Sequence, residues 1–250
     1  MSIDDRRHLM FFQTAPQACA YVPERTAIQR LADPYRPLSR AVYSRLIAQG
    51  FRRSGCFIYR PDCPACSACI PARLPVADFR PNRGQRRNRR HNHDLHWQLA
   101  TPSDDPEYTA LYQRYLRQRH PGGGMDESND ESLLRFLACD WFETSFLALR
   151  DGDDRLLGVA VTDVLDDALS AVYTFFEPDE PRRGLGTFAV LAQLELAREM
   201  GLSHLYLGYW IRELPNMAYK ARFRPLEVRV DDQWRLLETA WESELPGAGG

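Results

Sequence analysis

The sequence predicts an α+β protein of mixed α/β content, in which an N-terminal cysteine-containing domain precedes a domain with a mainly antiparallel sheet. Between residues 144 and 178, hydrophobic residues alternate with period two in three runs, which the acidic turns DGDD and DD separate. Helical periodicity flanks these runs at residues 103–119, 128–139 and 187–200. An earlier segment, residues 62–79, is rich in cysteine and proline and predicts a loop with a brief extended run.

The first half is expected to begin with an amphipathic helix over residues 38–50. Ser39 is suited to its N-cap, and Gly50 to its end. The next run, FRRSGCFIYRP, combines β-branched and aromatic residues and predicts one short strand that Pro61 closes.

The second half is predicted to continue with helices and then strands. An early Pro106 and a Ser/Asp cap favour the start of a helix, and Gly201 favours the end of another. The pair Asp231 and Asp232 between two β-like runs predicts a hairpin. The expected order is helices over 103–119 and 128–139, strands over 145–150, 156–165 and 168–178, a helix over 187–200, a strand over 204–211, a short helix over 216–223, and a hairpin over 226–237.

Composition places the chain among soluble globular proteins. It has 250 residues, of which 44% are hydrophobic and 26% charged, and no apolar run approaches the length of a membrane span. The first residues lack the pattern of a secretion signal. We therefore expect a cytoplasmic protein with no membrane contact, whose six cysteines are reduced thiols.

Charge divides the chain into two halves although the formal net charge is only −2. Residues 1–99 contain 17 Arg and 7 acidic residues, whereas residues 100–250 contain 15 basic and 27 acidic residues. A strongly basic half suggests a polyanionic partner. We expect a basic N-terminal domain over residues 1–99 and a second domain over residues 100–250.

The stretch PRRGLG, residues 181–186, joins a β-like run to a helix. Such a junction presents backbone N–H groups at a helix start, which suits an anionic or electron-rich ligand. A strand, R-R-G-x-G, a helix and another strand in this order resemble the acyl-CoA-binding core of the GCN5-related N-acetyltransferase fold. The resemblance implies ligand contacts from Arg183, Gly184, Leu185, Gly186 and Thr187. The alternative is a tight turn without a ligand, because a short glycine motif is weakly specific.

Arginines gather in the segment FRPNRGQRRNRRHNHDL, residues 79–95. Guanidinium groups bind phosphate oxygens in a forked geometry, and the neighbouring Asn and Gln side chains suit sugars or bases. The segment predicts nucleic-acid binding, whereas the alternative is an ordinary solvated charged face. The candidate tRNA-binding residues are Arg83, Arg86, Arg87, Arg89 and Arg90.

Several stretches together resemble the arginyl-tRNA–protein transferase family, and most closely its bacterial branch, the aspartate/glutamate leucyltransferases. The resemblance spans almost the whole chain and is specific as a set. The matching stretches are CAYVPER, FRRSGCFIYRPDCPACSACIPARLPV, FRPNRGQRRNRRHNHDL, YLRQRHPGGGM, YTFFEPDEPRRGLGTFAV, LYLGYWI and MAYKARFRP.

The resemblance implies an aminoacyltransferase that moves leucine from leucyl-tRNA to the N-terminal Asp or Glu of proteins and so marks them for degradation by the N-end rule pathway. The fold that the resemblance implies is an N-terminal domain that carries the cysteines and an acetyltransferase-like aminoacyl-transfer domain over residues 100–250. The loop PRRGLG would then hold the aminoacylated 3′ end of the tRNA. Two other function classes remain open from the residues alone. One is a coenzyme A-dependent N-acetyltransferase with an RNA-binding segment, and the other is an RNA-binding protein without enzyme activity.

Lys220 is the only lysine of the chain and lies in the matching stretch MAYKARFRP. A compact ammonium there suits the side chain of an acidic acceptor or the leaving hydroxyl, with Arg222 as a second positive charge. The alternative is an ordinary surface lysine. Tyr209 is a second candidate catalytic residue, because the strand over 204–211 should border the acyl site. An aromatic residue in such a strand is otherwise part of the core.

The cysteines form C-x-x-C-x-x-C at Cys63, Cys66 and Cys69, a spacing known from zinc and iron–sulfur sites. Cys19 or Cys56 would supply a fourth ligand. Reduced structural cysteines are the alternative, because no second C-x-x-C pair accompanies the first. We expect the transfer reaction to require no cofactor.

Overall fold

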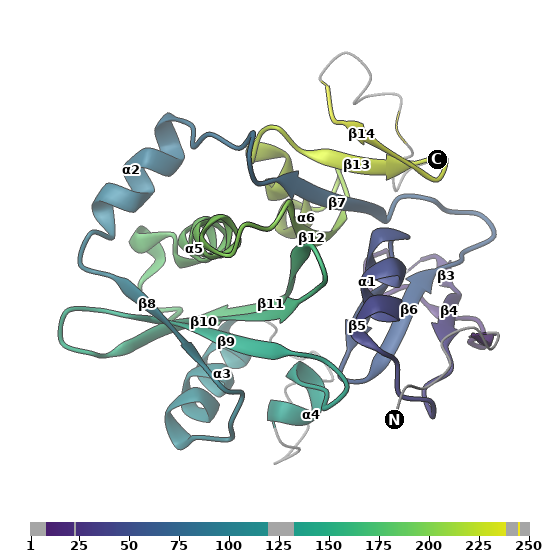
Figure 1. Cartoon of the computed structure of the whole chain (residues 1–250), viewed down its shortest axis with the longest axis horizontal. Helices are drawn as coiled ribbons and strands as arrows, with labels where there is room; N and C mark the ends of the chain where they lie inside the picture. Colours follow the sequence, from purple (N-terminus) through teal and green to yellow (C-terminus); the bar gives the residue numbers. More distant parts are fainter. Residues whose placement is uncertain (1–8, 23, 120–132, 239–244, 246–250) are drawn as a thin grey trace.

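The computed structural model of the chain describes residues 9–22, 24–119, 133–238 and 245. Its main feature is an eight-stranded, mainly antiparallel sheet with helices on both faces (Figure 1). Across the sheet, the strands are β14 (Gln233–Leu236), β13 (Glu227–Val230), β7 (Ile70–Pro75), β12 (His204–Trp210), β11 (Ala168–Phe176), β10 (Leu156–Val164), β9 (Thr144–Arg150) and β8 (His96–Ala100).

A smaller four-stranded sheet lies beside the large one, with helix α1 (Arg40–Ala48) next to it (Figure 1). Its strands are, in order, β1 (Phe11–Gln13), β4 (Gln29–Ala32), β6 (Phe57–Pro61) and β5 (Arg52–Ser54), and a further pair consists of β2 (Gln17–Ala18) and β3 (Thr26–Ala27). The predicted N-cap of α1 is confirmed, because the Ser39 side chain accepts a hydrogen bond from the Val42 N–H.

The large sheet is buried on both faces by different helices (Figure 1). Helix α5 (Leu185–Glu199) packs on one face, against side chains such as Leu149 and Leu169. Helices α3 (Pro106–Arg119) and α4 (Leu133–Leu137) cover the other face, where Phe146 and Phe175 point. The central strands therefore carry apolar side chains on both sides, and the sheet is the core of the molecule.

The predicted meander and hairpin are confirmed. Strands β9, β10 and β11 pair antiparallel in sequence order, and β13 pairs with β14 through the turn at Asp231 and Asp232. Both aspartates have positive φ, 49° and 59°, which is the geometry of a two-residue type I′ hairpin turn. The predicted short helix after β12 forms as α6 (Pro215–Ala218) followed by a 3-10 turn, Tyr219–Arg222.

Two elements differ from the prediction. The run FRRSGCFIYRP forms two antiparallel strands, β5 and β6, because Gly55 adopts a left-handed φ of 54° that reverses the chain. The arginine-rich segment contains a helix, α2 (Arg83–His91), which periodicity did not predict because Gln85 is its one buried residue. Of the predicted helix over 128–139, residues 128–132 lie outside the described residues.

The division into parts at residues 99 and 100 stays a prediction. The large sheet takes strands from both parts, since β7 lies between β12 and β13, and β8 forms the outer strand next to β9. Strand β7 is the extended run that the sequence predicted within residues 62–79.

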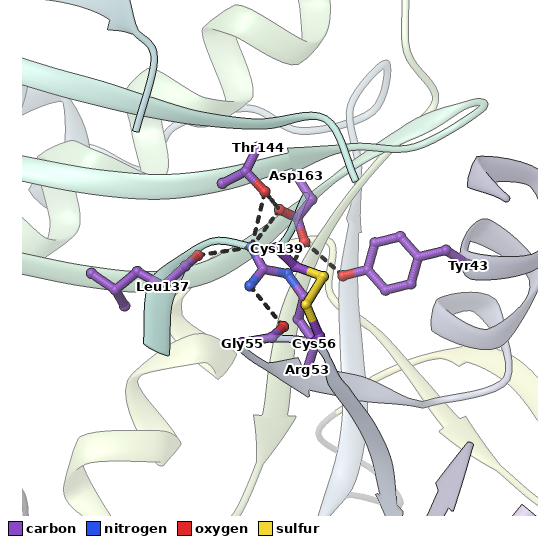
Figure 2. Close-up of a disulfide and its surroundings, with 8 residues drawn as sticks. All are labelled: Tyr43, Arg53, Gly55, Cys56, Leu137, Cys139, Thr144 and Asp163. Carbon is purple, nitrogen blue, oxygen red and sulfur yellow. Dashed lines mark hydrogen bonds and ion pairs between the residues drawn. A yellow bond between two sulfur atoms is a disulfide. The ribbon is translucent and has the colours of Figure 1, made fainter. Parts of the chain in front are cut away.

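A buried ion pair ties the small sheet to the large one (Figure 2). Arg53 donates two hydrogen bonds of 2.6 Å to the Asp163 carboxylate, which also accepts from Tyr43 and Thr144. The Arg53 and Asp163 side chains are 1% and 0% exposed. Because each charge is fully hydrogen-bonded, the pair is tolerated in the core and fixes the position of β5.

A disulfide between Cys56 and Cys139 lies beside this pair (Figure 2). The expectation that all six cysteines are reduced is therefore wrong for these two. The fold brings their Cα atoms to 5.2 Å, a separation that suits a disulfide, although 83 residues separate them in sequence. Cys56 is consequently not available as a fourth ligand for the C-x-x-C-x-x-C cysteines.

Candidate active site

A cleft opens where the parallel strands β11 and β12 diverge. They pair only through Ala168–Ser170 and His204–Tyr206, although both strands continue further. At the same place β12 slips in register against β7, and Gly208 takes a left-handed φ of 85°. A cavity of about 680 Å³ lies between the separated strands. Its walls also include residues 184–187, the small sheet and Lys220.

The glycine loop, residues 181–186, leads directly into α5. Gly184 has a φ of 59° and stands at the N-cap of the helix, so that the following amides begin its first turn. The Thr187 N–H donates to the Gly184 carbonyl at 3.0 Å. Leu185 and Gly186 stand in the first turn, where a helix supplies no acceptor for their N–H groups, and both residues line the cavity. The loop is thus placed to bind an anionic or carbonyl oxygen.

Helix α2 holds the glycine loop in position. The Asn88 side chain donates to the carbonyls of Arg183 and Gly184 at 2.8 and 3.2 Å, and Asn92 donates to Arg183 at 2.8 Å. At the other end of the helix, Asn82 and Gln85 donate to the Arg222 carbonyl. The amides that the sequence suggested for sugars or bases therefore bind the protein's own backbone.

The five candidate arginines of α2 differ in their surroundings. Arg83, Arg86, Arg87 and Arg90 are exposed, which leaves their guanidinium groups open to solvent. Arg89 is half-buried and forms an ion pair with Glu195 of α5. Arg89 consequently helps to dock the helix, and the four exposed side chains present the positive charge.

Two predicted site residues are not among the described residues that line the cavity. The Arg183 side chain forms a bidentate ion pair with Asp94, with both distances 2.9 Å. Arg222 is exposed, and its backbone carbonyl is bound by α2. The backbone carbonyls of these two residues join the loop and the 3-10 turn to α2.

Lys220 is buried at the cavity wall, with 5% of its surface exposed, and so is not an ordinary surface lysine. Its Nζ donates to the Tyr209 carbonyl and lies 3.4 Å from the Met217 sulfur. Burial, and then the nearby Arg52, lowers the pKa of this ammonium to about 7. Tyr209 also lines the cavity, but its hydroxyl donates a hydrogen bond to the Gly50 carbonyl at 2.9 Å.

Arg52 is a cavity residue that sequence reasoning missed. It is 7% exposed, and burial lowers its pKa. The pattern F-R-R-S in a predicted strand was the available signal, because alternation sends two successive arginines to opposite faces of a strand. Both residues line the cavity, but the Arg53 guanidinium is paired with Asp163, whereas Arg52 has no such ion pair among the described residues.

The four remaining cysteines lie near one another. Burial, followed by the charges of Cys19, Cys66 and Cys63, raises the pKa of the Cys69 thiol to about 12. Within the described ranges, however, the structure has no group of three His, Cys, Asp or Glu side chains arranged to hold a metal ion. Metal binding at Cys19, Cys63, Cys66 and Cys69 stays a prediction.

Two family models match the chain. The model of the arginine-tRNA-protein transferase N terminus matches residues 17–87, and the model of its C terminus matches residues 107–230. These ranges include the C-x-x-C-x-x-C cysteines, most of α2, the glycine loop and Lys220.

Curated relatives match over nearly their full length. An aspartate/glutamate leucyltransferase of Nitrosococcus oceani is 48% identical over 91% of this chain and 96% of its own. One of Halorhodospira halophila is 48% identical over 93% of this chain and 99% of its own.

Solved structures resemble the chain more distantly. L-PGS from Bacillus licheniformis aligns with 56% of this chain and 45% of its own at 14% identity and a TM-score of 0.44. A GCN5-related glucosamine N-acetyltransferase region of a fungal β-N-acetylglucosaminidase covers 56% of this chain and 18% of that one at 12% identity, with a TM-score of 0.37. No helix in the described part of the chain is long and apolar enough to cross a membrane.

Proposed function

The chain belongs to the arginine-tRNA-protein transferase family, and from this premise we propose that it transfers leucine from leucyl-tRNA to the N-terminal Asp or Glu of proteins. The proposal rests on these relatives together with one structural observation: the start of helix α5 and the buried Lys220 line the same cavity. A product that begins with leucine would enter the N-end rule pathway of degradation, in the cytoplasm.

The reaction is the aminolysis of an ester. The acceptor's neutral α-amine attacks the leucyl carbonyl carbon, and the C–O bond to the terminal ribose breaks as the new C–N bond forms. The nitrogen loses one proton, and the ribose oxygen gains one and leaves as a hydroxyl. An α-amine has a pKa near ~7.7–8.0, so a useful fraction is neutral at cytosolic pH and no strong base is needed. Since the ester is already activated, orientation of the two substrates supplies roughly 7–11 kcal/mol in favourable cases.

The cavity suits this reaction because it has room for two reactants and a polar wall for charge. We assign the Leu185 and Gly186 amides to the leucyl end of the tRNA, where they bind a phosphate or the oxyanion that develops on the attacked carbonyl. Lys220 stabilises the leaving ribose hydroxyl or the acceptor's carboxylate. The Tyr209 carbonyl fixes the Lys220 ammonium, so Tyr209 acts as a positioning residue.

The tRNA body is assigned to the exposed face of α2. Its four exposed arginines suit phosphate oxygens, and the same helix holds the glycine loop through Asn88. A tRNA bound there would therefore have its acceptor end directed towards the cleft. No cofactor is assigned to the transfer itself, and elemental analysis of anaerobically purified protein tests the cysteine group for zinc or iron.

The test uses three radiolabelled donors with one peptide that begins with Asp. We expect label from leucyl-tRNA in the peptide and none from arginyl-tRNA or acetyl-coenzyme A. Label from acetyl-coenzyme A alone would identify an N-acetyltransferase, and label from none of the donors would contradict a transfer activity.

A further inference from the structure

Arg52 carries a buried positive charge for which the described residues offer no carboxylate. Its Nη1 donates to the Ser170 hydroxyl at 3.3 Å, whereas Nε and Nη2 have no hydrogen-bond partner among the described residues. The Tyr206 ring, whose centre lies 5.9 Å from the guanidinium carbon, offsets part of the cost of this burial. A buried charge without a carboxylate is still costly, which points to a further, anionic partner. Arg53, the next residue, shows the contrast, because its guanidinium is fully paired with Asp163 and neighbouring oxygens.

Arg52 and Lys220 face the same point of the cavity. A Cβ atom built on Gly208 would lie 3.6 Å from Lys220 Nζ and 3.8 and 3.9 Å from Arg52 Nε and Nη2. Glycine at this position therefore leaves open the space between the two cations. Both residues are more than nine-tenths buried. The Lys220 ammonium bonds to a carbonyl and a sulfur and lies 5.9 Å from the centre of the Tyr219 ring, and none of these groups carries a negative charge.

We propose that Arg52, together with Lys220, binds the side-chain carboxylate of the acceptor's N-terminal Asp or Glu and thereby determines the acceptor specificity. The inference rests on the proposed function and names the residue that recognises the acceptor's N-terminal side chain. A planar guanidinium with two free donors on one edge matches the two oxygens of a carboxylate.

The position of the two cations favours a side-chain carboxylate over a phosphate of the tRNA. Arg52 bonds to Ser170, the last residue of β11 that pairs with β12, and so lies where the cleft closes. A phosphodiester continues along the chain in both directions and needs an open groove. A side-chain carboxylate is a terminal group, so it fits a site that is closed at one end. The leucyl side chain is apolar and would form no favourable interaction with a guanidinium.

The experiment compares four peptides that differ in their first residue only: Asp, Asn, Glu and Gln. For the wild-type enzyme with saturating leucyl-tRNA, kcat/KM should be higher for each acid than for its amide. Arg52→Gln should lower kcat/KM for the acidic peptides at least tenfold, leave the amides within about twofold, and leave the KM for leucyl-tRNA unchanged. Arg52→Lys should restore part of the preference.

Arg45→Gln is the matched control, because Arg45 is an exposed arginine on α1 away from the cavity. It should preserve every rate. The melting temperature of Arg52→Gln should not fall below that of the wild type, since the substitution removes an unpaired buried charge. A second measurement needs no variant: succinate should compete with the Asp peptide for the wild-type enzyme, and succinamide should not.

Two results would overturn the inference. One is an unchanged ratio of rates for Asp and Asn peptides in Arg52→Gln. The other is an equal loss for all peptides with a lower content of bound metal, which would assign the Arg52 charge to the nearby cysteines. If the wild-type enzyme transfers leucine to no peptide, the proposed function fails, and calorimetric binding of succinate to wild type and Arg52→Gln still tests the site.

Discussion

Lys220 combines a buried position with a positive charge, and its neighbours explain how the fold tolerates it. The Tyr209 carbonyl and the Met217 sulfur contact the ammonium, and no carboxylate among the described residues neutralises it. A buried lysine in such surroundings lowers the free energy of unfolding, and residues of this kind are found mainly at functional sites.

Replacing Lys220 by Met should reduce the transfer of leucine to acidic peptides at least tenfold, which is about 1.4 kcal/mol of transition-state stabilisation. Met is an unbranched side chain one atom shorter than Lys, and it removes the charge together with the hydrogen bond to the Tyr209 carbonyl. Single-turnover kinetics with labelled leucyl-tRNA measure the rate, and filter binding measures the affinity for tRNA. Wild-type rates in this variant, or an equal loss of tRNA affinity, would contradict the role assigned to Lys220.

The pKa of Lys220 also predicts a pH dependence of stability. The pKa is about 7 in the folded protein and near ~10.4 in the unfolded chain, so between these values the unfolded state binds more protons. The cost of burying the ammonium is complete below pH 7 and disappears as the pH rises towards 10. Lys220→Met lacks this cost, so its advantage over the wild type in urea unfolding should be larger at pH 7 than at pH 9.5. An advantage that stays constant over this range would contradict the prediction.

Helix α2 connects two functions at the level of an element. Its exposed face carries arginines, and its other face binds the glycine loop and the 3-10 turn of Lys220 through amides. We therefore expect that a polyanion bound to the exposed face would also affect the geometry of the cleft.

Replacing the exposed arginines Arg83, Arg86, Arg87 and Arg90 by Gln should weaken tRNA binding and reduce the slope of log K against log salt concentration by as much as ~3–4, because each phosphate contact contributes slightly less than one to that slope. Titrations from 50 to 300 mM salt measure it. Arg89→Gln is the control for the tRNA interaction, since Arg89 pairs with Glu195 and should affect stability more than the slope. A slope identical to the wild type in the fourfold variant would refute tRNA binding by this face.

The glycine loop predicts intolerance of side chains at Gly186. A Cβ there would lie 3.3 Å from the Phe176 ring, at the wall of the cavity, and the branches of a valine would occupy the space in front of the Leu185 and Gly186 amides. Gly186→Val should abolish detectable transfer while the melting temperature falls by only a few degrees. Calorimetry measures the melting temperature, and the labelled-leucine assay measures the transfer. An active variant would show that the loop is a turn without a role in ligand binding.

At the scale of the whole molecule, the small sheet completes the cleft of the large one. Arg52 comes from β5, and the Arg53–Asp163 pair with the Cys56–Cys139 disulfide fixes that strand against the large sheet (Figure 2). The N-terminal residues thus contribute to the cleft in addition to presenting α2.

Expression of residues 1–99 and 100–250 as separate chains tests the predicted division. Because β7 lies between β12 and β13, we expect the second fragment alone to expose the edges of both strands and to lack a cooperative unfolding transition. Circular dichroism and calorimetry measure this. A second fragment that melts cooperatively and gives a dispersed NMR spectrum would support two independent domains.

The sequence predicted those parts of the fold that local patterns determine. Helix α5, the meander and the Asp231–Asp232 hairpin follow from periodicity and turn residues, and the glycine loop follows from its motif. Helix α2 was missed because it has no apolar stripe, and its partners are carbonyls 91 to 140 residues away in sequence. Arg52 was missed because buried positions are predicted from apolar residues, and an arginine without an acidic partner is expected at the surface.

The place of β7 in the sheet determines when the cleft can exist during synthesis. Residues 70–75 leave the ribosome long before their partners in β12 and β13 are synthesised, so β7 is unpaired in the growing chain. An unpaired strand is a template for aggregation, but Pro71, Arg73 and Pro75 make this one a poor template. The growing chain is thereby protected, and no shortened chain that lacks β12 can carry the finished cleft.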